Sequence, residues 1–374
     1  MSSQEKKNVL TKLPRSSNLE LYRIICMLMI VAHHYVVNSG LMSEDSPLMT
    51  DSMAGNSVFL WLFGAWGKTG INCFLLITGY FMCTNQITTR KFLKLLLQIY
   101  LYKLLLYPIF LCAGYETLKF GRIFKLLMPF WGLRYDFAGC FLIFYLTIPF
   151  LSILVRTMNK RQHQLLMLLT LGCYTLLGSV SYPFPRFNIS FNYFTWFCIL
   201  FLVASYIRLH PSPLFGRRRL WGWMTLVNIS LAMASIVVMQ NLYSEGYFFL
   251  EDSNKFFAVS VAFSSFLWFK NMNIRYSKII NSCAAATFGV LLIHANSNAM
   301  RTWLWKDTVD VMGHYSQPLG QLVLYSIGIV MSVFVICNVI DQLRIATLEK
   351  WFFKWYDKKL SLRIEEIVKK ITQL

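Results

Sequence analysis

The sequence predicts an all-α, polytopic membrane protein with about ten transmembrane helices. Of its 374 residues, 56% are hydrophobic and only 14% are charged, whereas about 25% of the residues are charged in ordinary soluble domains. Apolar runs of about 20 residues, long enough to cross a bilayer, recur along the chain with aromatic residues near their ends. We therefore expect the chain to be embedded in a membrane over most of its length.

Ten apolar runs define the expected transmembrane spans. They cover residues 19–37, 66–83, 92–113, 137–155, 164–180, 192–209, 220–240, 256–270, 279–299 and 319–341. The first run is too long for a signal peptide and ends without a small-residue cleavage site, so we expect it to be retained. The runs predict one membrane domain over residues 19–341, between a tail at 1–18 and a basic amphipathic tail at 342–374 on the inner leaflet.

The distribution of charge predicts the orientation of these spans. The net charge is +19, and most of the 36 Lys and Arg residues lie in the two tails and in the loops that follow the even-numbered spans. This pattern places both termini in the cytoplasm and favours contact with anionic lipids over binding of nucleic acid. The loop 114–136 carries cations on the expected outer side, and we expect a re-entrant or interfacial helix in it.

The nine cysteines are expected to pack within the spans. They lie almost entirely inside the apolar runs, and neither a CxxC motif nor a Cys/His ligand spacing is present. We interpret them as small packing residues, and we expect neither disulfide bonds nor a bound metal.

The first span contains charged residues where a membrane helix is normally apolar. Arg23 and His34 are eleven residues apart, which places both on one helix face with about 16 Å of rise between them. His33 falls off that face, and Glu20 lies one turn before Arg23 as a plausible partner. Ionisable groups at membrane depth are costly and are usually functional. A buried polar cluster that ties helices together is the alternative interpretation.

Cations near the second and third spans form another set of candidates. Arg90 and Lys91 follow the second span on the cytoplasmic side, where an anionic ligand from the cytosol would meet them. The same two residues also serve as topology signals. Lys103 lies midway along the third span, as either a buried ion-pair partner or a cation that lines a pore.

The ninth span ends in a polar segment. His294 lies in its outer half, at a depth comparable to that of His34, and Asn296, Asn298 and Arg301 follow. A lone histidine near a helix end often has a structural role, but the shared depth makes a joint site with His34 equally plausible.

Several motifs together resemble the acyltransferase-3 family of integral membrane O-acyltransferases. Arg23 and His34, separated by ten residues, match a hallmark of that family. The other matches, in chain order, are Phe74-Leu-Leu-Ile-Thr-Gly-Tyr80, Phe144-Tyr-Leu-Thr-Ile-Pro149, Tyr206-Ile-Arg208 and Thr287-Phe-Gly-Val-Leu-Leu-Ile-His294. They span residues 19 to about 305, and the chain looks most like members that acetylate bacterial capsular polysaccharides or exopolysaccharides. Three positions depart from the pattern of the family: Thr78 replaces a frequent serine, Leu291 a frequent tyrosine and Ala295 a frequent aspartate.

The resemblance implies an O-acetyltransferase in the cell (inner or plasma) membrane. Such enzymes take an acetyl group from cytosolic acetyl-CoA and pass it to a hydroxyl of a cell-surface or lipid-linked polysaccharide. Arg23, Arg90 and Lys91 would contact the donor, and His34 would act as a general base or carry the acetyl group covalently, with Arg23 orienting it. The expected supporting residues are Glu20, Lys103, His294, Asn296 and Arg301. The expected partners are a glycan acceptor, acetyl-CoA, the lipid bilayer and other proteins of polysaccharide assembly.

Two alternatives belong to other functional classes. In a secondary transporter or flippase for an anionic or glycan substrate, Arg23, Lys103 and His34 would line the transport path. The sequence lacks the paired, Gly/Pro-broken helices typical of inverted repeats, which disfavours this class. A non-catalytic scaffold in a polysaccharide-assembly complex is the third interpretation.

Overall fold

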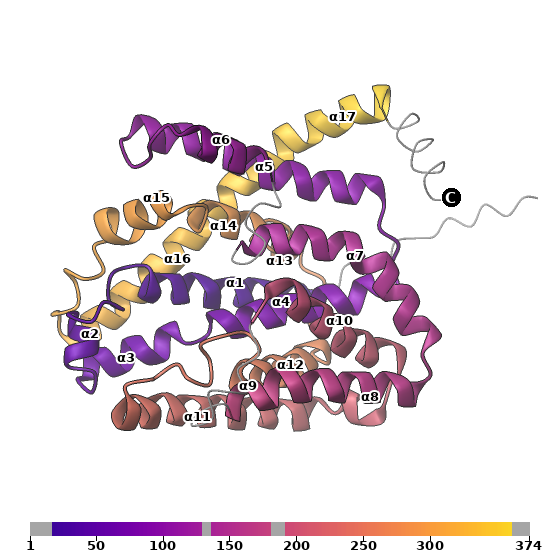
Figure 1. Cartoon of the computed structure of the whole chain (residues 1–374), viewed down its shortest axis with the longest axis horizontal. Coiled ribbons are helices and arrows are strands. Elements are labelled where there is room, and N and C mark those ends of the chain that lie inside the picture. The colour runs from indigo at the N-terminus through magenta and orange to yellow at the C-terminus, as the bar shows by residue number, and fades with distance from the viewer. Residues whose placement is uncertain (1–16, 129–135, 181–190, 361–374) are drawn as a thin grey trace, which may run out of the picture.

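The protein folds into a bundle of helices, as predicted. The computed structural model describes residues 17–128, 136–180 and 191–360, and all regular structure within these ranges is helical. Helices α1 and α4 run through the middle of the bundle, α8 and α11 cover one side, and α5, α6 and α17 lie on the opposite side (Figure 1). The predicted all-α, polytopic class is therefore confirmed.

Each of the ten predicted spans overlaps a helix or a consecutive pair of helices, and the second is longer than predicted, because α3 precedes its expected start at residue 66. The ten are α1 (Ser17–Val37), α3 (Gly55–Gly64) with α4 (Gly67–Met82), α5 (Thr89–Cys112), α7 (Phe137–Thr157), α8 (Lys160–Leu171) with α9 (Leu177–Val180), α10 (Tyr193–Leu209), α11 (Arg218–Tyr243), α12 (Phe256–Lys270), α13 (Lys278–Ala285) with α14 (Thr287–His294), and α16 (Leu319–Arg344). Seven helical runs in the described ranges are long and apolar enough to cross a membrane, and a bent pair adds an eighth. The helices α10 and α12 are shorter, with 17 and 15 residues.

Short helices and turns complete the described structure. They are α2 (Pro47–Thr50), α6 (Phe120–Leu127), α15 (Asn298–Arg301), α17 (Lys350–Lys359), a 3-10 turn at Pro213–Gly216 and π-helical turns at Gly172–Leu176, Thr302–Thr308 and Ile345–Glu349. The helix predicted in the 114–136 loop is present as α6, whereas residues 129–135 of that loop lie outside the described residues.

The central helices pack closely because small residues line their contact. A side-chain carbon at Gly70 of α4 would lie 2.8 Å from the carbonyl oxygen of Cys26 on α1, so only glycine fits at this separation. At Gly67 the same carbon would overlap the ring of His33. Close approach through small residues is the usual way in which membrane helices gain packing energy, and here it fixes the position of α1 against α4.

The ninth predicted span is broken, which corrects the prediction of one straight helix over 279–299. Helix α14 ends at His294, and the segment Asn298–Thr308 leaves at 95° to the segment Lys278–His294. Ser297 accepts a hydrogen bond from the backbone N–H of Met300 and so caps a new helix, while the side chain of Asn296 donates back to the carbonyl of Leu292. These local hydrogen bonds replace helical ones and turn the chain.

The tenth predicted span does not end at residue 341. Helix α16 continues through the π-helical turn into α17, so one helical run extends from Leu319 to Lys359. Ion pairs bind this extension to the start of α5: Lys94 lies 2.6 Å from Glu349, and Arg90 lies 2.5 Å from Asp357. The first part of the predicted tail is therefore a docked helix, and residues 361–374 lie outside the described residues.

Contacts between helix ends follow the alternating direction that the ten spans require. Asn18, at the start of α1, donates to the carbonyls of Phe269 and Lys270 at the end of α12. Arg156, at the end of α7, donates to the carbonyl of Cys83, just after α4. We call this the inner end of the bundle, because the charge pattern predicts that it faces the cytoplasm, and the opposite one the outer end.

Candidate active site

The two histidines predicted at a shared depth are hydrogen-bonded to each other. His34 lies in the last turn of α1 and His294 is the last residue of α14, and Nδ1 of His34 is 2.9 Å from Nε2 of His294. The side chain of His294 is completely buried. The tertiary structure thus brings together residues that are 260 positions apart in the sequence.

The hydrogen bonds of His294 define which nitrogen of His34 is free. Nδ1 of His294 lies 2.6 Å from the carbonyl oxygen of Val290, which can only accept, so this nitrogen carries the proton. Nε2 of the neutral, buried His294 therefore accepts a hydrogen bond from the Nδ1–H group of His34. Nε2 of His34 is left with a lone pair and without a hydrogen-bond partner among the described residues. This arrangement suits a base or a nucleophile.

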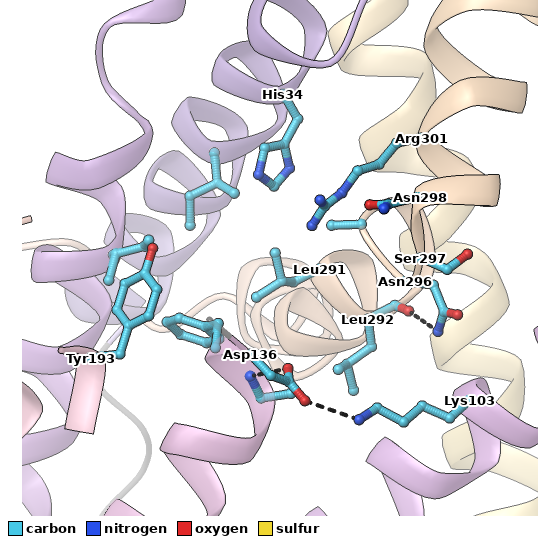
Figure 2. A pocket seen from close by; sticks show the side chains of 15 residues that line it. His34, Lys103, Asp136, Tyr193, Leu291, Leu292, Asn296, Ser297, Asn298 and Arg301 are labelled. Carbon is cyan, nitrogen blue, oxygen red and sulfur yellow. Dashed lines mark hydrogen bonds and ion pairs between the residues drawn. The ribbon is translucent and has the colours of Figure 1, made fainter. Parts of the chain in front are cut away.

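His34 faces a cavity of about 580 Å³ (Figure 2). The cavity lies near the outer ends of α1 and α14, and its titratable lining residues are His34, Lys103, Asp136, Tyr193 and Arg301. Two other cavities, of about 310 and 370 Å³, are lined almost wholly by apolar side chains. A concave site that combines apolar walls with a few converging polar groups is the usual form of a ligand-binding site.

Lys103 and Asp136 form an ion pair at the edge of this cavity. Nζ of Lys103, on α5, lies 3.1 Å from Oδ2 of Asp136. Asp136 caps the start of α7 through its other oxygen, which accepts from the backbone N–H of Ala138. Lys103 is thus an ion-pair partner, the first of its two interpretations, and it also lines the cavity.

The bend after α14 supplies the neutral polar wall of the cavity. Asn296, Ser297 and Asn298 line it from the segment that connects α14 to α15, and Tyr193 lines it from the start of α10. The hydroxyl of Tyr193 accepts a hydrogen bond of 3.2 Å from Lys68, which also lies 3.6 Å from Asp252. A straight ninth span would carry the polar residues away along the helix, whereas the 95° turn folds them over the cavity.

Aromatic rings separate the cavity from the inner end of the bundle. The rings of Phe74 on α4 and Phe288 on α14 are stacked with centroids 6.5 Å apart, and the ring of Phe141 on α7 lies 5.6 Å from that of Phe288. Each ring lies three or four residues to the inner side of a cavity residue on its own helix, namely Ile71, Leu291 and Phe137. The three rings therefore lie on the inner side of the cavity.

The predicted cations of the inner end do not line this cavity. Arg23 lies 3.3 Å from Glu20 in an ion pair, about three helical turns from His34 along the unbroken α1. Arg90 donates to both oxygens of Asp357, and Lys91 donates to the carbonyl of Gln86. The structure joins His34, His294, Asn296, Arg301 and Lys103 in one site and keeps the other predicted residues apart from it.

His33 points away from the site, as its helical phase predicted. Its Nδ1 lies 2.6 Å from the carbonyl oxygen of Gly64, and its ring packs on Gly67. The neighbouring histidines of α1 therefore have separate surroundings: His34 faces the cavity and His33 faces the junction of α3 and α4.

Among the cavity residues that sequence reasoning missed are Asp136 and Tyr193. Both lie at helix starts, and each reaches the cavity from a helix remote in sequence from His34. The one available signal was an acid directly before the fourth apolar run, where a helix cap is as good an explanation. Within the described ranges, no three His, Cys, Asp or Glu side chains gather as a metal site requires.

Comparison with known families identifies the class of protein. Residues 16–340 match the family model described as an acyltransferase domain, which covers well over half of the chain. Comparisons with curated proteins and with solved structures found no match. The matched region contains the His34–His294 pair, the cavity and every helix from α1 to α14. The chain therefore belongs to the acyltransferase-3 family and is a multi-pass membrane acyltransferase.

Proposed function

We propose that this protein transfers an acetyl group from cytosolic acetyl-CoA to a hydroxyl group of a cell-surface or lipid-linked polysaccharide. The enzyme would work in the cytoplasmic membrane, beside other proteins of polysaccharide assembly. The observation that carries the proposal is the pair of His34 and His294, which presents the free Nε2 of His34 to a polar cavity.

The chemistry assigns one role to each histidine. Nε2 of His34 removes the proton from the acceptor hydroxyl while the hydroxyl oxygen attacks the carbonyl carbon of the acetyl thioester. The carbon–sulfur bond then breaks, and the coenzyme A thiolate takes up the proton from His34. His294 holds His34 in the required tautomer and shares the positive charge that develops on it.

The same residues support a covalent route. In that route Nε2 of His34 attacks the carbonyl carbon of the thioester, the carbon–sulfur bond breaks and coenzyme A leaves as its thiolate, so that His34 carries the acetyl group as an acyl-imidazole. The acceptor hydroxyl then attacks the acetyl carbon, the bond to Nε2 breaks and the hydroxyl proton passes to the freed Nε2. Both routes use the same nitrogen and the same hydrogen bond to His294. A donor that arrives from the inner end must pass the rings of Phe74, Phe141 and Phe288, so we expect these rings to move when the donor binds.

The proposed donor contacts lie at the inner end. Arg23 is partly exposed there, with 23% of its side chain accessible, and Glu20 orients it. Arg90 holds Asp357, so it would have to exchange this carboxylate for a phosphate of the donor. Arg23 would likewise have to exchange the carboxylate of Glu20, so both cations remain proposed contacts for the phosphates of coenzyme A.

The test uses the full chain, purified into lipid nanodiscs, with radiolabelled acetyl-CoA and a chemically de-O-acetylated glycan from the parent cells. We expect acetyl transfer by the native protein and a loss of about 10²–10⁴-fold in His34→Ala, the usual contribution of a general base. His33→Gln is the matched control, because this neighbouring histidine faces away from the cavity. Its activity per folded molecule should stay near that of the native protein.

Two outcomes would contradict the proposal. Undiminished transfer by His34→Ala would remove the catalytic role of this residue. The absence of both acetyl transfer and thermal stabilisation by acetyl-CoA would instead favour the transporter or the scaffold, which need not bind the donor.

A further inference from the structure

Among the described residues that line the cavity beside His34, the cations outnumber the anions by one. Its charged lining residues are Lys103, Asp136 and Arg301, and Asp136 is already 3.1 Å from Lys103. Lys68 donates a hydrogen bond to the cavity residue Tyr193, but it has its own carboxylate partner, Asp252. Arg301 is therefore the cation whose charge is left over among the described residues around the cavity.

The side chain of Arg301 has no hydrogen bond or ion pair to any described residue. Its Nε is buried and lacks an acceptor, although a buried guanidinium normally has several. Asp136 and the hydroxyl of Tyr193 face it across the cavity beyond hydrogen-bond distance. A partly buried cation without a bound anion is costly to the fold, which indicates that a ligand completes this site.

Arg301 lies on the side of the cavity from which the acceptor would enter. It follows the 95° bend after His294, on the outer side of the histidine pair, whereas the route from the inner end reaches His34 past Phe288. Figure 2 shows its guanidinium extended into the cavity towards His34. The group that it binds would therefore belong to the acceptor, close to the hydroxyl that loses its proton.

We infer that Arg301 binds an acidic group, a carboxylate or a phosphate, on the acceptor glycan. The planar guanidinium matches the two oxygens of such a group and forms strong, bidentate hydrogen bonds with it. This inference rests on the proposed function and specifies its substrate: the acetylated sugar is acidic or adjoins an acidic residue.

The first experiment measures binding without acetyl transfer. The full chain in nanodiscs is mixed with an oligosaccharide of alternating glucuronate and glucose, or with the same oligosaccharide after carboxyl reduction to its neutral form. A second pair is an oligosaccharide substituted with glycerol phosphate and the same oligosaccharide after removal of the phosphate. We expect one acidic probe to raise the melting temperature of the native protein and its neutral partner to have no effect. The probe that works distinguishes a carboxylate ligand from a phosphate ligand.

The second experiment measures acetyl transfer to the same probes. Arg301→Gln should lower kcat/KM for the acidic acceptor by about 10–100-fold, mainly through KM, and so remove the preference of the native protein for the acidic over the neutral acceptor. Arg301→Lys keeps the charge without the planar fork and should recover part of the loss. A fall in kcat for acidic and neutral acceptors alike would overturn the inference, because it would mean that Arg301 stabilises the reacting carbonyl or only the fold.

The two readouts separate the inference from the proposed function. Binding of an acidic probe that depends on Arg301, without any acetyl transfer, would contradict the proposed function alone. Acetyl transfer without a preference between acidic and neutral acceptors would contradict the inference alone.

Discussion

One buried carboxylate explains why position 289, in the motif that ends at His294, is a glycine. A side-chain carbon at Gly289 would overlap the carboxyl group of Asp341, which lies on α16 and is completely buried. Three side chains, those of Gln98, Tyr102 and Arg344, donate hydrogen bonds to this carboxylate, so it cannot move aside easily. The absence of a side chain at Gly289 therefore lets α14 approach α16 and places His294 at the correct height beside His34.

We predict that Gly289→Ala destabilises the protein by about 1–3 kcal/mol, the usual cost of overfilling a packed interior. Gly328→Ala is the matched control, because a side-chain carbon there would meet no atom within 4 Å. It should leave the stability unchanged or raise it slightly, since alanine favours helix more than glycine does. Thermal unfolding of both variants in nanodiscs measures the difference. Equal melting temperatures would show that the contact with Asp341 relaxes freely.

At the level of single residues, the sequence predicted what depends on helical phase and depth. The phase of α1 separated His34 from His33, and the depth of the ninth span matched His294 with His34, because both properties are local to one helix. Asp136 and Tyr193 could not be found in this way. Their place at the cavity depends on how α7 and α10 pack against the other helices, which the period of one helix does not encode.

At the level of elements, a buried polar network connects α16 and α17 to α5. Asp341 accepts from Arg344 at 2.6 Å, from Tyr102 at 2.7 Å and from Gln98 at 3.2 Å. Arg344 in turn donates to Glu349 at 2.7 Å, which continues the network into the π-helical turn. This network keeps the last span and its extension in one helical run, beyond the end that hydropathy alone predicted.

We predict that Asp341→Ala destabilises the protein by about 3–5 kcal/mol, because Arg344 is left buried without its main partner. Asp357→Asn breaks the ion pair of Arg90, whose two partners are about half exposed, and should cost about 0–1 kcal/mol. Urea or thermal unfolding of the two variants in the same nanodiscs gives the comparison. A similar loss of stability in both variants would mean that the docking of α17, and not the buried network, contributes most to the stability of this region.

The ends and bends of helices were harder to predict from the sequence than their existence. Hydropathy located a helix in each of the ten runs because each run is strongly apolar, although α10 and α12 are shorter than the other spans. Hydropathy missed the turn after His294, because the residues there are only moderately polar. The turn is made by local hydrogen bonds: Ser297 caps a new helix, and the side chain of Asn296 donates to the carbonyl of Leu292. Hydropathy also missed the continuation past residue 341, because it treats charged side chains as solvated, whereas Arg344 is paired and buried.

At the level of the whole molecule, the two ends of the bundle differ in chemistry. The inner end holds Arg23 and the ion pairs that attach α17 to α5, and the His34 cavity lies towards the outer end. A bundle of this kind can receive a charged donor from one side of the membrane and an acceptor from the other. The proposed function therefore depends on the orientation of the bundle as much as on the cavity itself.

We predict that residues near the outer end react with reagents outside the cell and those near the inner end do not. The test introduces Glu44→Cys or Arg217→Cys into a Cys112→Ser background, because Glu44 and Arg217 are exposed and Cys112 is the exposed native cysteine. A membrane-impermeant maleimide on intact cells should label the cysteine at position 44 alone, and after permeabilisation it should label both positions. Labelling at position 217 alone in intact cells would show that the bundle has the opposite orientation in the membrane. The His34 cavity would then lie towards the cytoplasm, which would contradict the entry of an acceptor from outside the cell.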